Sequence, residues 1–274
     1  MNSTIAVQGT QGANSQTACE RLFGESGIMY FGTFDAVFNA VDKGLCRYGI
    51  LPLENSLNGS VAEVYDLMRK YSFFITKSVK VKINHVLLAN HGAFAPQIKE
   101  IYSHEQALAQ CSSFLKNLNN VKITDYANTA IAARAVSESG RNNIAAIADP
   151  NCAKLYDLSV ISQDIQNNPN NYTRFICISK ELEIEEGADQ ISLMFTLEHK
   201  PGSLYEFIGR FADIGVNLTK LESRPIPGSD FEFMFYAELE ASMKSQKIVD
   251  LIEKLKALPQ TLMFLGNYRE VTDK

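Results

Sequence analysis

The chain has 274 residues, of which 46% are hydrophobic and 21% are charged, so it is an ordinary globular protein long enough for two domains. A net charge of -5 argues against general binding to nucleic acids or acidic membranes, because no basic field attracts phosphates. The N-terminal run lacks the basic and apolar segments of a signal peptide, and no later run approaches the ~18 apolar residues of a membrane span. We therefore expect a cytoplasmic protein.

The cysteines and histidines indicate neither disulfides nor a metal site. Five cysteines are an odd number without a CxxC pair, which favours reduced and buried thiols. The four histidines show no metal-ligand spacing, and no Ser/His/Asp pattern indicates a hydrolase. We expect no metal and no cofactor.

Short apolar runs alternate with amphipathic helical patterns from Thr4 to Ser179, which predicts an α/β architecture with mostly parallel strands. Thr33 is the predicted cap of a helix that ends at Gly44, and another helix follows Val61. The predicted strands are Thr4–Val7, Tyr48–Pro52, Val79–Ala89, Glu100–Tyr102, Val121–Asp125, Ile144–Ala148 and Phe175–Ser179.

An acidic segment without periodicity, Glu181–Asp189, follows the last of these strands and predicts a domain boundary. Beyond it, alternating apolar residues and helical spacings predict the order βαββαβ of a ferredoxin-like domain. Its third strand is predicted from three alternating aromatic residues, Phe231, Phe233 and Phe235. We expect one region over residues 1–181 and a second over residues 188–270.

Asn167–Phe175, NNPNNYTRF, is rich in Asn and predicts an ordered loop that presents Thr173 and Arg174. Taken alone, the run fits a solvated surface loop better than a site. Arg174 can pair with a carboxylate in bidentate fashion, and Phe175 can face an unsaturated ring.

Polar residues also follow other predicted strands, where open α/β sheets bind their ligands. The run Gly9–Ala18 fits either an anion site at a helix start or a tight turn with Ser15 as N-cap. Beyond the next strand stand Glu54, Asn55 and Ser56, where Glu54 is either a buried base or, as we prefer, a structural carboxylate.

The run SHEQALAQC predicts a capping box formed by Ser103 and Gln106 at a helix start. Helical spacing places Ser103, Gln106 and Gln110 on one face, where they could line a cleft; capping and solvation is the competing interpretation. A catalytic role of His104 is disfavoured. In NTAIAAR, Thr129 extends the polar lining, and several such junctions together favour a site.

Taken together, these motifs are similar to those of the prephenate dehydratase family. The resemblance rests on GTQGANS, PLENSLNGSV, SHEQALAQC, IADPNCAKLYDL and NYTRF, followed by HKPGSLY and LTKLESRP, in this order along nearly the whole chain. It implies two α/β lobes that resemble those of periplasmic binding proteins, with the active site in the cleft between them. The second region resembles the ACT regulatory domain, and no chorismate mutase segment is evident, so a monofunctional enzyme is implied.

The family reaction removes hydroxide and carbon dioxide from prephenate to give phenylpyruvate, on the route to L-phenylalanine. The resemblance implies that Thr173 donates a hydrogen bond to the departing oxygen, with Glu54 as the rival acid. Arg174 is implied as an anchor of a substrate carboxylate, and Phe175 as a neighbour of the ring. Ser103, Gln106 and Gln110 complete the implied polar lining.

For the second region, the resemblance implies that L-phenylalanine binds as an allosteric effector where ACT domains pair, in a homodimer or homotetramer. The implied effector residues are His199, Pro201, Gly202, Ser203, Leu204, Glu222, Ser223, Arg224 and Pro225. The chain departs from the family pattern at four positions, Asn14, Glu105, Asn167 and Ser203.

Two alternatives to a prephenate dehydratase stay open at this point. An arogenate dehydratase would use the same fold, and its substrate differs in one amino group that the sequence does not reveal. A non-catalytic amino-acid sensor is the alternative from a different class, because two-lobed clefts and ACT domains also serve as binding modules.

Overall fold

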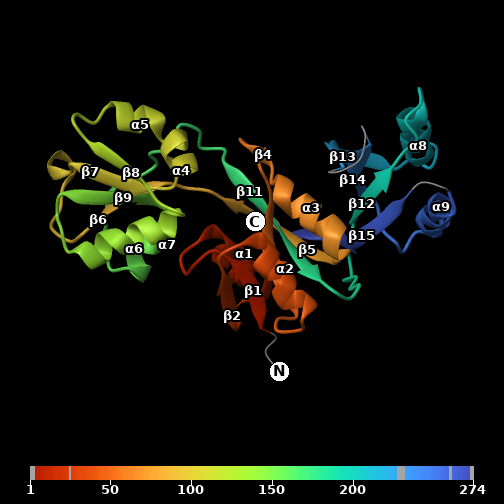
Figure 1. Cartoon of the computed structure of the whole chain (residues 1–274), viewed down its shortest axis with the longest axis horizontal. Coiled ribbons are helices and arrows are strands. Elements are labelled where there is room, and N and C mark those ends of the chain that lie inside the picture. The colour runs from red at the N-terminus through yellow and green to blue at the C-terminus, as the bar shows by residue number, and fades with distance from the viewer. Residues whose placement is uncertain (1–3, 25, 227–231, 259–260, 272–274) are drawn as a thin grey trace.

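The computed structural model describes residues 4–24, 26–226, 232–258 and 261–271, and its elements form three groups that lie in a row (Figure 1). The middle group, lobe 1, contains the first strands and helices of the chain. Lobe 2 lies on one side of it, and the C-terminal unit, which begins at Gln190, lies on the other.

Lobe 1 is built on a mixed sheet in the order β16-β5-β11-β3-β1-β2, with β4 paired to β3. β11 runs antiparallel to both of its neighbours, whereas β1 is parallel to β2 and β3. Its elements are β1 (Ile5–Gln8), α1 (Asn14–Phe23), β2 (Ile28–Phe31), α2 (Phe34–Asp42), β3 (Tyr48–Asn55), β4 (Gly59–Ser60), α3 (Ala62–Tyr71), β5 (Phe74–Lys82), β11 (Tyr172–Ser179) and β16 (Glu270–Val271).

Lobe 2 has a second mixed sheet in the order β10-β6-β9-β7-β8, in which β7 is parallel to β8 and β9. Its elements are β6 (Val86–Ala89), the 3-10 helix η1 (Ala95–Gln97), β7 (Glu100–Ser103), α4 (Glu105–Gln110), α5 (Ser112–Lys116), β8 (Lys122–Asp125), α6 (Thr129–Ser139), β9 (Ile144–Ala148), α7 (Asn151–Leu155) and β10 (Ser159–Ser162).

The C-terminal unit confirms the predicted βαββαβ order, with an antiparallel sheet in the order β13-β14-β12-β15. Phe231 lies outside the described residues, and the third strand begins at Phe233. The elements are β12 (Gln190–Thr196), α8 (Ser203–Ala212), β13 (Asn217–Pro225), β14 (Phe233–Glu240), α9 (Gln246–Lys256) and β15 (Leu262–Tyr268).

The chain crosses between the lobes twice, from β5 to β6 and from β10 to β11. The single strand predicted over Val79–Ala89 is wrong, because its apolar run continues through the first crossover and belongs to two sheets. The two crossovers are hydrogen-bonded to each other, with Ile83 N donating to Asn171 O at 2.8 Å. Because β11 enters lobe 1 antiparallel to its neighbours, and β6 likewise in lobe 2, the expectation of mostly parallel strands is wrong as well.

Two strands without a sequence prediction, β2 and β10, lie at the edges of their sheets. Neither strand contains a fully buried residue. The alternation of buried and exposed residues that reveals a strand in sequence is therefore weak in both.

Several expected local features are confirmed. The Thr33 side chain accepts a hydrogen bond from Ala36 N at the start of α2, and Gly44 follows that helix with a φ of +71°. All five cysteines are free and buried.

Across the described residues, no helix is both long and apolar enough to cross a membrane.

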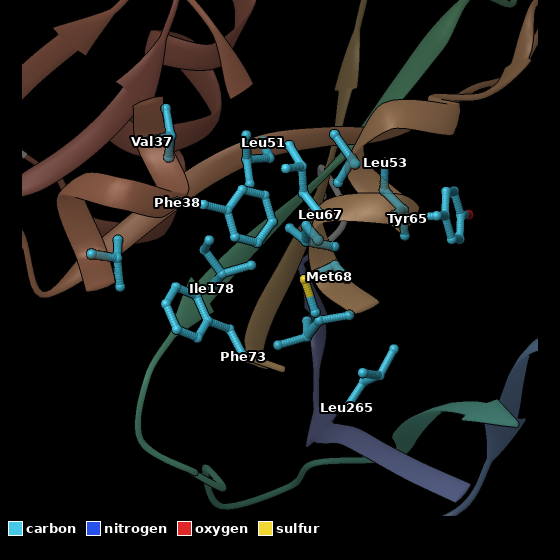
Figure 2. Packing of buried hydrophobic residues seen from close by; sticks show 14 of the residues in the cluster. Val37, Phe38, Leu51, Leu53, Tyr65, Leu67, Met68, Phe73, Ile178 and Leu265 are labelled. Atoms are coloured by element: carbon cyan, nitrogen blue, oxygen red, sulfur yellow. The ribbon is translucent and has the colours of Figure 1, made fainter. Parts of the chain in front are cut away.

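Lobe 1 and the C-terminal unit share one hydrophobic core (Figure 2). Phe38 of α2, Leu51 of β3, Met68 of α3 and Ile178 of β11 lie in this cluster, and Leu265 of β15 joins it. Burial of a side chain of this size contributes roughly 1.5–3 kcal/mol. The C-terminal unit is thus packed on lobe 1 and not merely tethered to it.

Only glycine fits where β15 passes β5. Gly266 has a φ of +146°, and a Cβ atom on it would overlap the carbonyl oxygen of Ile75. This close approach of two backbones fixes the position of β15 on lobe 1.

Candidate functional site

A pocket of about 460 Å³ lies where lobe 1, lobe 2 and the second crossover meet. The turn between β3 and β4 lines it from lobe 1, and α4 lines it from lobe 2. Its most frequent side chains are amides, namely Asn58, Gln106, Gln110, Gln166, Asn167, Asn168 and Asn171. Amides both donate and accept hydrogen bonds, so the pocket suits a polar ligand.

The capping box predicted at the start of α4 is wrong. The N-cap is His104, whose Nδ1 accepts a hydrogen bond from Gln106 N at 3.2 Å. Ser103 is fully buried at the end of β7, and its hydroxyl donates to Ile147 O of β9 at 2.6 Å. Gln106 and Gln110 therefore line the pocket, whereas Ser103 joins two strands beneath it.

Asn167–Phe175 is a loop only in its first half, because β11 begins at Tyr172. Thr173 stands opposite Asn55 of β3 in the sheet register. Nδ2 of Asn55 donates to Thr173 Oγ1 at 3.0 Å. The predicted polar residues of two distant motifs thus come into direct contact.

Further hydrogen bonds connect Thr173 to the pocket through Asn171, a residue that sequence reasoning treated only as a loop former. Asn55 Nδ2 also donates to Asn171 Oδ1 at 2.8 Å, and Asn171 Nδ2 donates to Gln110 Oε1 at 2.9 Å. Asn171 is fully buried. A buried amide needs hydrogen-bond partners for both its oxygen and its nitrogen. Asn171 therefore holds Asn55 and Gln110 in fixed positions.

Arg174 is not available to a substrate carboxylate. Its side chain is 6% exposed, and the guanidinium donates two hydrogen bonds of 2.7 Å to Glu238 of β14. Its Nε lies 2.8 Å from Glu54 Oε1 without hydrogen-bond geometry. Burial alone would lower the pKa of the Arg174 guanidinium, but Glu238 outweighs it and holds the pKa above its ordinary value. Arg174 therefore joins lobe 1 to the C-terminal unit.

Glu54 is an ionised structural carboxylate. Lys220 of β13 pairs with it, and Arg174 lies on its other side. Burial would raise the pKa of Glu54, yet the two cations hold it below the ordinary value of 4.5. A carboxylate with a lowered pKa is a poor proton donor at neutral pH, which argues against Glu54 as the acid.

Three further predicted residues stand outside the pocket lining. Phe175 is 3% exposed in the core beneath α1, so its expected place beside a substrate ring is wrong. The Ser56 hydroxyl accepts from Tyr172 N at 3.0 Å and so fixes the start of β11. Thr129 is the first residue of α6, whose N-cap is Asn128.

The loop Gly9–Ala13, which precedes α1, faces lobe 2. A Cβ atom on Gly12 would contact Leu155 and Cys152 of α7, and Tyr156 Oη donates to Gln11 O at 2.6 Å. Ser15 is not the cap of α1, because Ala13 occupies that position and the Ser15 hydroxyl donates to Gln8 O. The start of α1 thus adjoins the second lobe, as an anion site between lobes requires.

A second pocket, of about 710 Å³, lies on the C-terminal unit. His199, Ser203 and Leu204 line it, while Pro201 and Gly202 form the turn before α8. The other predicted group points elsewhere within this chain: Glu222 hydrogen-bonds to Ser60, and Arg224 lies 3.3 Å from Asp66 of α3. Ser223 and Pro225 lie beside them on β13.

Besides Ser203 in the second pocket, two departures from the family pattern have a structural place. Oδ1 of Asn167 accepts from Ser113 N at 3.0 Å, and its Nδ2 donates to Ser112 Oγ at 2.9 Å. Asn167 therefore ties the second crossover to the start of α5. Glu105 is the first residue of α4 and lines the pocket between the lobes.

A serine, a histidine and an aspartate are linked on lobe 2, although no sequence pattern indicated this. Ser159 Oγ lies 2.8 Å from His91 Nδ1, and His91 Nε2 lies 3.0 Å from Asp157 Oδ1. The side chains of His91 and Asp157 are 63% and 94% exposed. Such exposure leaves bulk water around the group.

The chain matches the family model described as prephenate dehydratase over residues 5–183. It is 35% identical over 276 residues to "Arogenate dehydratase/prephenate dehydratase 2, chloroplastic" of Arabidopsis thaliana, a match that covers 96% of this chain and 72% of that protein. It is 32% identical over 266 residues to "Bifunctional chorismate mutase/prephenate dehydratase" of Pseudomonas aeruginosa, with coverages of 96% and 72%.

Solved structures are similar over nearly the whole chain. A prephenate dehydratase from Arthrobacter aurescens in complex with L-Phe superposes with a TM-score of 0.85 and 29% identity, covering 97% of this chain and 89% of that one. A structure titled "GqqA- a novel type of quorum quenching acylases" superposes with a TM-score of 0.86 and 28% identity, covering 98% of each chain.

Proposed function

Because the chain belongs to the prephenate dehydratase family, we propose that it converts prephenate to phenylpyruvate in L-phenylalanine biosynthesis. The observation that carries the proposal is the hydrogen bond from Asn55 to the Thr173 hydroxyl, next to a pocket lined by amides. Since Thr173 Oγ1 accepts from Asn55, the hydroxyl proton is directed elsewhere and is available to a ligand.

The proposed reaction breaks two bonds that join ring carbons of the substrate to their substituents. The carboxylate leaves as carbon dioxide, and the electron pair of its carbon–carbon bond enters the ring. The electron pair of the carbon–oxygen bond leaves with the hydroxyl group, which takes up a proton from solvent to form water. A hydrogen bond from Thr173 stabilises the charge that develops on this oxygen, and aromatisation drives the reaction.

We place the substrate carboxylates on donors other than Arg174, which is occupied by Glu238. Gln106 and Gln110 offer amide N–H groups in the pocket. The start of α1 lies outside the lining of this pocket and offers a second set of donors through its backbone N–H groups and positive dipole. These neutral donors can bind a carboxylate by hydrogen bonds alone, which accords with the amide-rich lining of the pocket.

Replacement of the Thr173 hydroxyl tests the proposal. Positioned proton donors typically contribute ~10²- to 10⁴-fold, so Thr173→Ala should lower kcat by about that factor while KM changes little. Thr173→Ser keeps the hydroxyl and is the matched control, with kcat near that of the wild type. A normal kcat of Thr173→Ala in steady-state assays with prephenate would exclude this role.

Arogenate is the second candidate substrate, because several relatives carry arogenate dehydratase in their names. The two substrates differ in a keto or amino group on the side chain. Incubation with each separates the cases, since prephenate gives phenylpyruvate and arogenate gives phenylalanine. Turnover of neither substrate would favour a non-catalytic amino-acid sensor.

We also propose that the C-terminal unit is an ACT domain over residues 188–270 that binds L-phenylalanine, following a catalytic region over residues 1–181. The similar Arthrobacter structure contains L-Phe, and the pocket lined by His199, Ser203 and Leu204 has room for an amino acid. We further propose that two such domains pair in a dimer or tetramer of a cytoplasmic enzyme, in which Glu222 and Arg224 keep their contacts with Ser60 and Asp66 of their own chain. Equal activity with and without phenylalanine would count against regulation.

Hydrolysis of an acyl amide is a lower-ranked candidate. One similar structure is titled an acylase, and Ser159, His91 and Asp157 form a hydrogen-bonded chain. The high exposure of His91 and Asp157 opposes it, because bulk water weakens the electrostatic interactions that would activate the serine. Release of acid from an acyl amide that is lost in Ser159→Ala would support this activity.

A further inference from the structure

We propose that His85 is a positioning residue of the dehydratase site. With its proton on Nε2, it orients the Gln110 carboxamide so that the amide N–H groups of Gln110 face the pocket. Through the same Gln110 oxygen it also holds Asn171, and thereby the hydrogen-bonded chain to Thr173. The kinetic test of this role rests on the proposed function. The hydrogen bonds of His85, Gln110 and Asn171 can be tested without any enzymatic activity.

His85 lies in the first crossover and is 4% exposed. Its backbone N donates to Gln166 Oε1 at 3.0 Å, and its carbonyl accepts from Ile165 N at 3.3 Å. Both partners belong to the second crossover. The imidazole is therefore fixed at the place where the two connections between the lobes lie side by side.

Backbone groups around Asn55 determine the direction of the hydrogen bonds that run from Asn55 through Asn171 and Gln110 to His85. A backbone N–H only donates and a backbone carbonyl only accepts. Asn55 Oδ1 accepts from Leu57 N at 3.1 Å and Asn58 N at 3.0 Å, and Asn55 Nδ2 donates to Tyr172 O at 3.1 Å. These three contacts fix which end of the Asn55 amide is oxygen. Asn55 Nδ2 must then donate to Asn171. Nδ2 has two hydrogens for its three acceptors, so one of its N–H groups is shared.

The hydrogen-bond directions at Asn171 and Gln110 follow from that at Asn55 and determine which nitrogen of the His85 imidazole is protonated. Since Asn171 Oδ1 accepts from Asn55, its Nδ2 is the donor to Gln110 Oε1 at 2.9 Å. The second contact of Gln110 Oε1 is His85 Nε2, also at 2.9 Å. An amide oxygen only accepts, so His85 Nε2 carries a proton.

Two consequences follow for the site. Both lone pairs of Gln110 Oε1 are used, so the Gln110 amide group cannot rotate without breaking two hydrogen bonds. Its Nε2 end belongs to a residue that lines the pocket. His85 Nδ1 is buried and has no hydrogen-bond partner among the described residues, so the neutral ring keeps its single proton on Nε2.

A second proton on His85 would place a buried, unpartnered N–H and a net charge in the crossover. Burial lowers the pKa of His85, which outweighs the hydrogen bond to Gln110 and the field of Asp149. Asp149 follows β9, and its own pKa is raised by burial. Gln110, Gln166 and Asn171, the other polar neighbours, carry no charge.

Kinetics of four variants test the positioning role. His85→Leu removes the donor and should lower kcat/KM about 10- to 100-fold, through a higher KM where Gln110 holds a carboxylate and a lower kcat where the chain reaches Thr173. His85→Gln keeps an N–H near the position of Nε2 and should remain within about threefold of the wild type. In a Gln110→Ala background, His85→Leu should cause no further loss, because its effect passes through Gln110. Independent, multiplicative losses, or a His85→Leu variant with wild-type kinetics, would overturn the proposal.

If His85→Leu does not fold, two other measurements test the proposal: the dependence of kcat/KM on pH and the tautomer of the His85 ring. Because a second proton would bury a charge in the crossover, kcat/KM should fall at a pH below the ordinary imidazole pKa of 6.5. This loss should disappear in His85→Gln and persist in Asp149→Asn; the reverse pattern overturns the proposal. In the unliganded wild type, ¹⁵N shifts at neutral pH should show a protonated Nε2 and a bare Nδ1. A proton on Nδ1 would overturn the geometry even if the protein acted on neither prephenate nor arogenate, an outcome that would separately overturn the proposed function.

Discussion

Thr173 and Arg174 are neighbours in β11, yet they serve different parts of the molecule. Successive side chains of a strand leave opposite faces, so Thr173 meets Asn55 while Arg174 reaches Glu238 in the C-terminal unit. The guanidinium is buried with carboxylates on more than one side. A buried pair of this kind is costly to break, because the remaining charge loses its partner.

Glu238→Gln should therefore lower the free energy of unfolding by about 3–5 kcal/mol. The matched comparison is the double variant Arg174→Met with Glu238→Leu, which removes both charges and should lose less than the single variant. Urea unfolding followed by circular dichroism measures both. A Glu238→Gln variant as stable as the wild type would show that the pair does not hold the two parts together.

The lowered pKa of Glu54 gives a signed dependence of stability on pH. A carboxylate whose folded pKa lies below its unfolded value binds fewer protons when folded, so its stabilising contribution is present above that unfolded value, about 4.5. This contribution is lost as the pH falls through the lowered pKa of the folded state. The difference in melting temperature between wild type and Glu54→Gln should be largest near pH 7 and should shrink in this acid range.

At the scale of elements, β15 and β5 show how a single residue type permits two backbones to approach. Gly266→Ala would place a methyl group against the Ile75 carbonyl in a backbone conformation that side chains rarely adopt. We expect a loss of roughly 1–3 kcal/mol in urea unfolding. Gly209→Ala in α8 is the control, because that position is open and alanine favours helix by up to about 1 kcal/mol. Equal effects of both changes would contradict this account.

Elements whose signals are local could be predicted from sequence. Thr33 caps its helix, and Ile144–Ala148 is a strand with the predicted bounds, because neighbouring residues determine these features. The break between β5 and β6 could not be predicted, since apolar residues continue through it. Ser103 was misassigned because β7 extends one residue further than its apolar pattern.

The candidate site shows the same limit at longer range. Thr173 and Asn55 were both singled out, but their contact depends on a sheet register between strands far apart in the chain. The partner of Arg174 could not be predicted, because Glu238 lies in a different unit and carries no motif. Asn171 and His85 were missed since only burial reveals that their polar atoms must be paired.

On the scale of the whole molecule, the C-terminal unit is bound to lobe 1 by a shared core and by several charged contacts. Lys220 of β13 pairs with Glu54 and also donates to Ser60 Oγ at 3.3 Å. Glu54 directly precedes Asn55, which holds the Thr173 hydroxyl. A shift of β13 on effector binding would thus act within one residue of the site.

If phenylalanine regulates the enzyme, Lys220→Met should weaken the coupling and raise the concentration needed for half-inhibition. Allosteric couplings of ~1 to 3 kcal/mol correspond to about 5- to 150-fold, which bounds the expected change. The control is Lys244→Met, whose side chain is 67% exposed in the same unit. Inhibition curves that coincide for wild type and Lys220→Met would exclude this route.

The two crossovers make lobe 2 a segment that can be exchanged between related proteins. Lobe 2 is one continuous insertion in the chain of lobe 1, and its entrance and exit are joined by the hydrogen bond of 2.8 Å between Ile83 and Asn171. An insertion whose ends meet can be exchanged as a cassette without changing the path of its host. A chimaera that receives this segment from a relative would take α4, and the side of the pocket that α4 lines, from that relative. Thr173 in β11 would stay that of this chain.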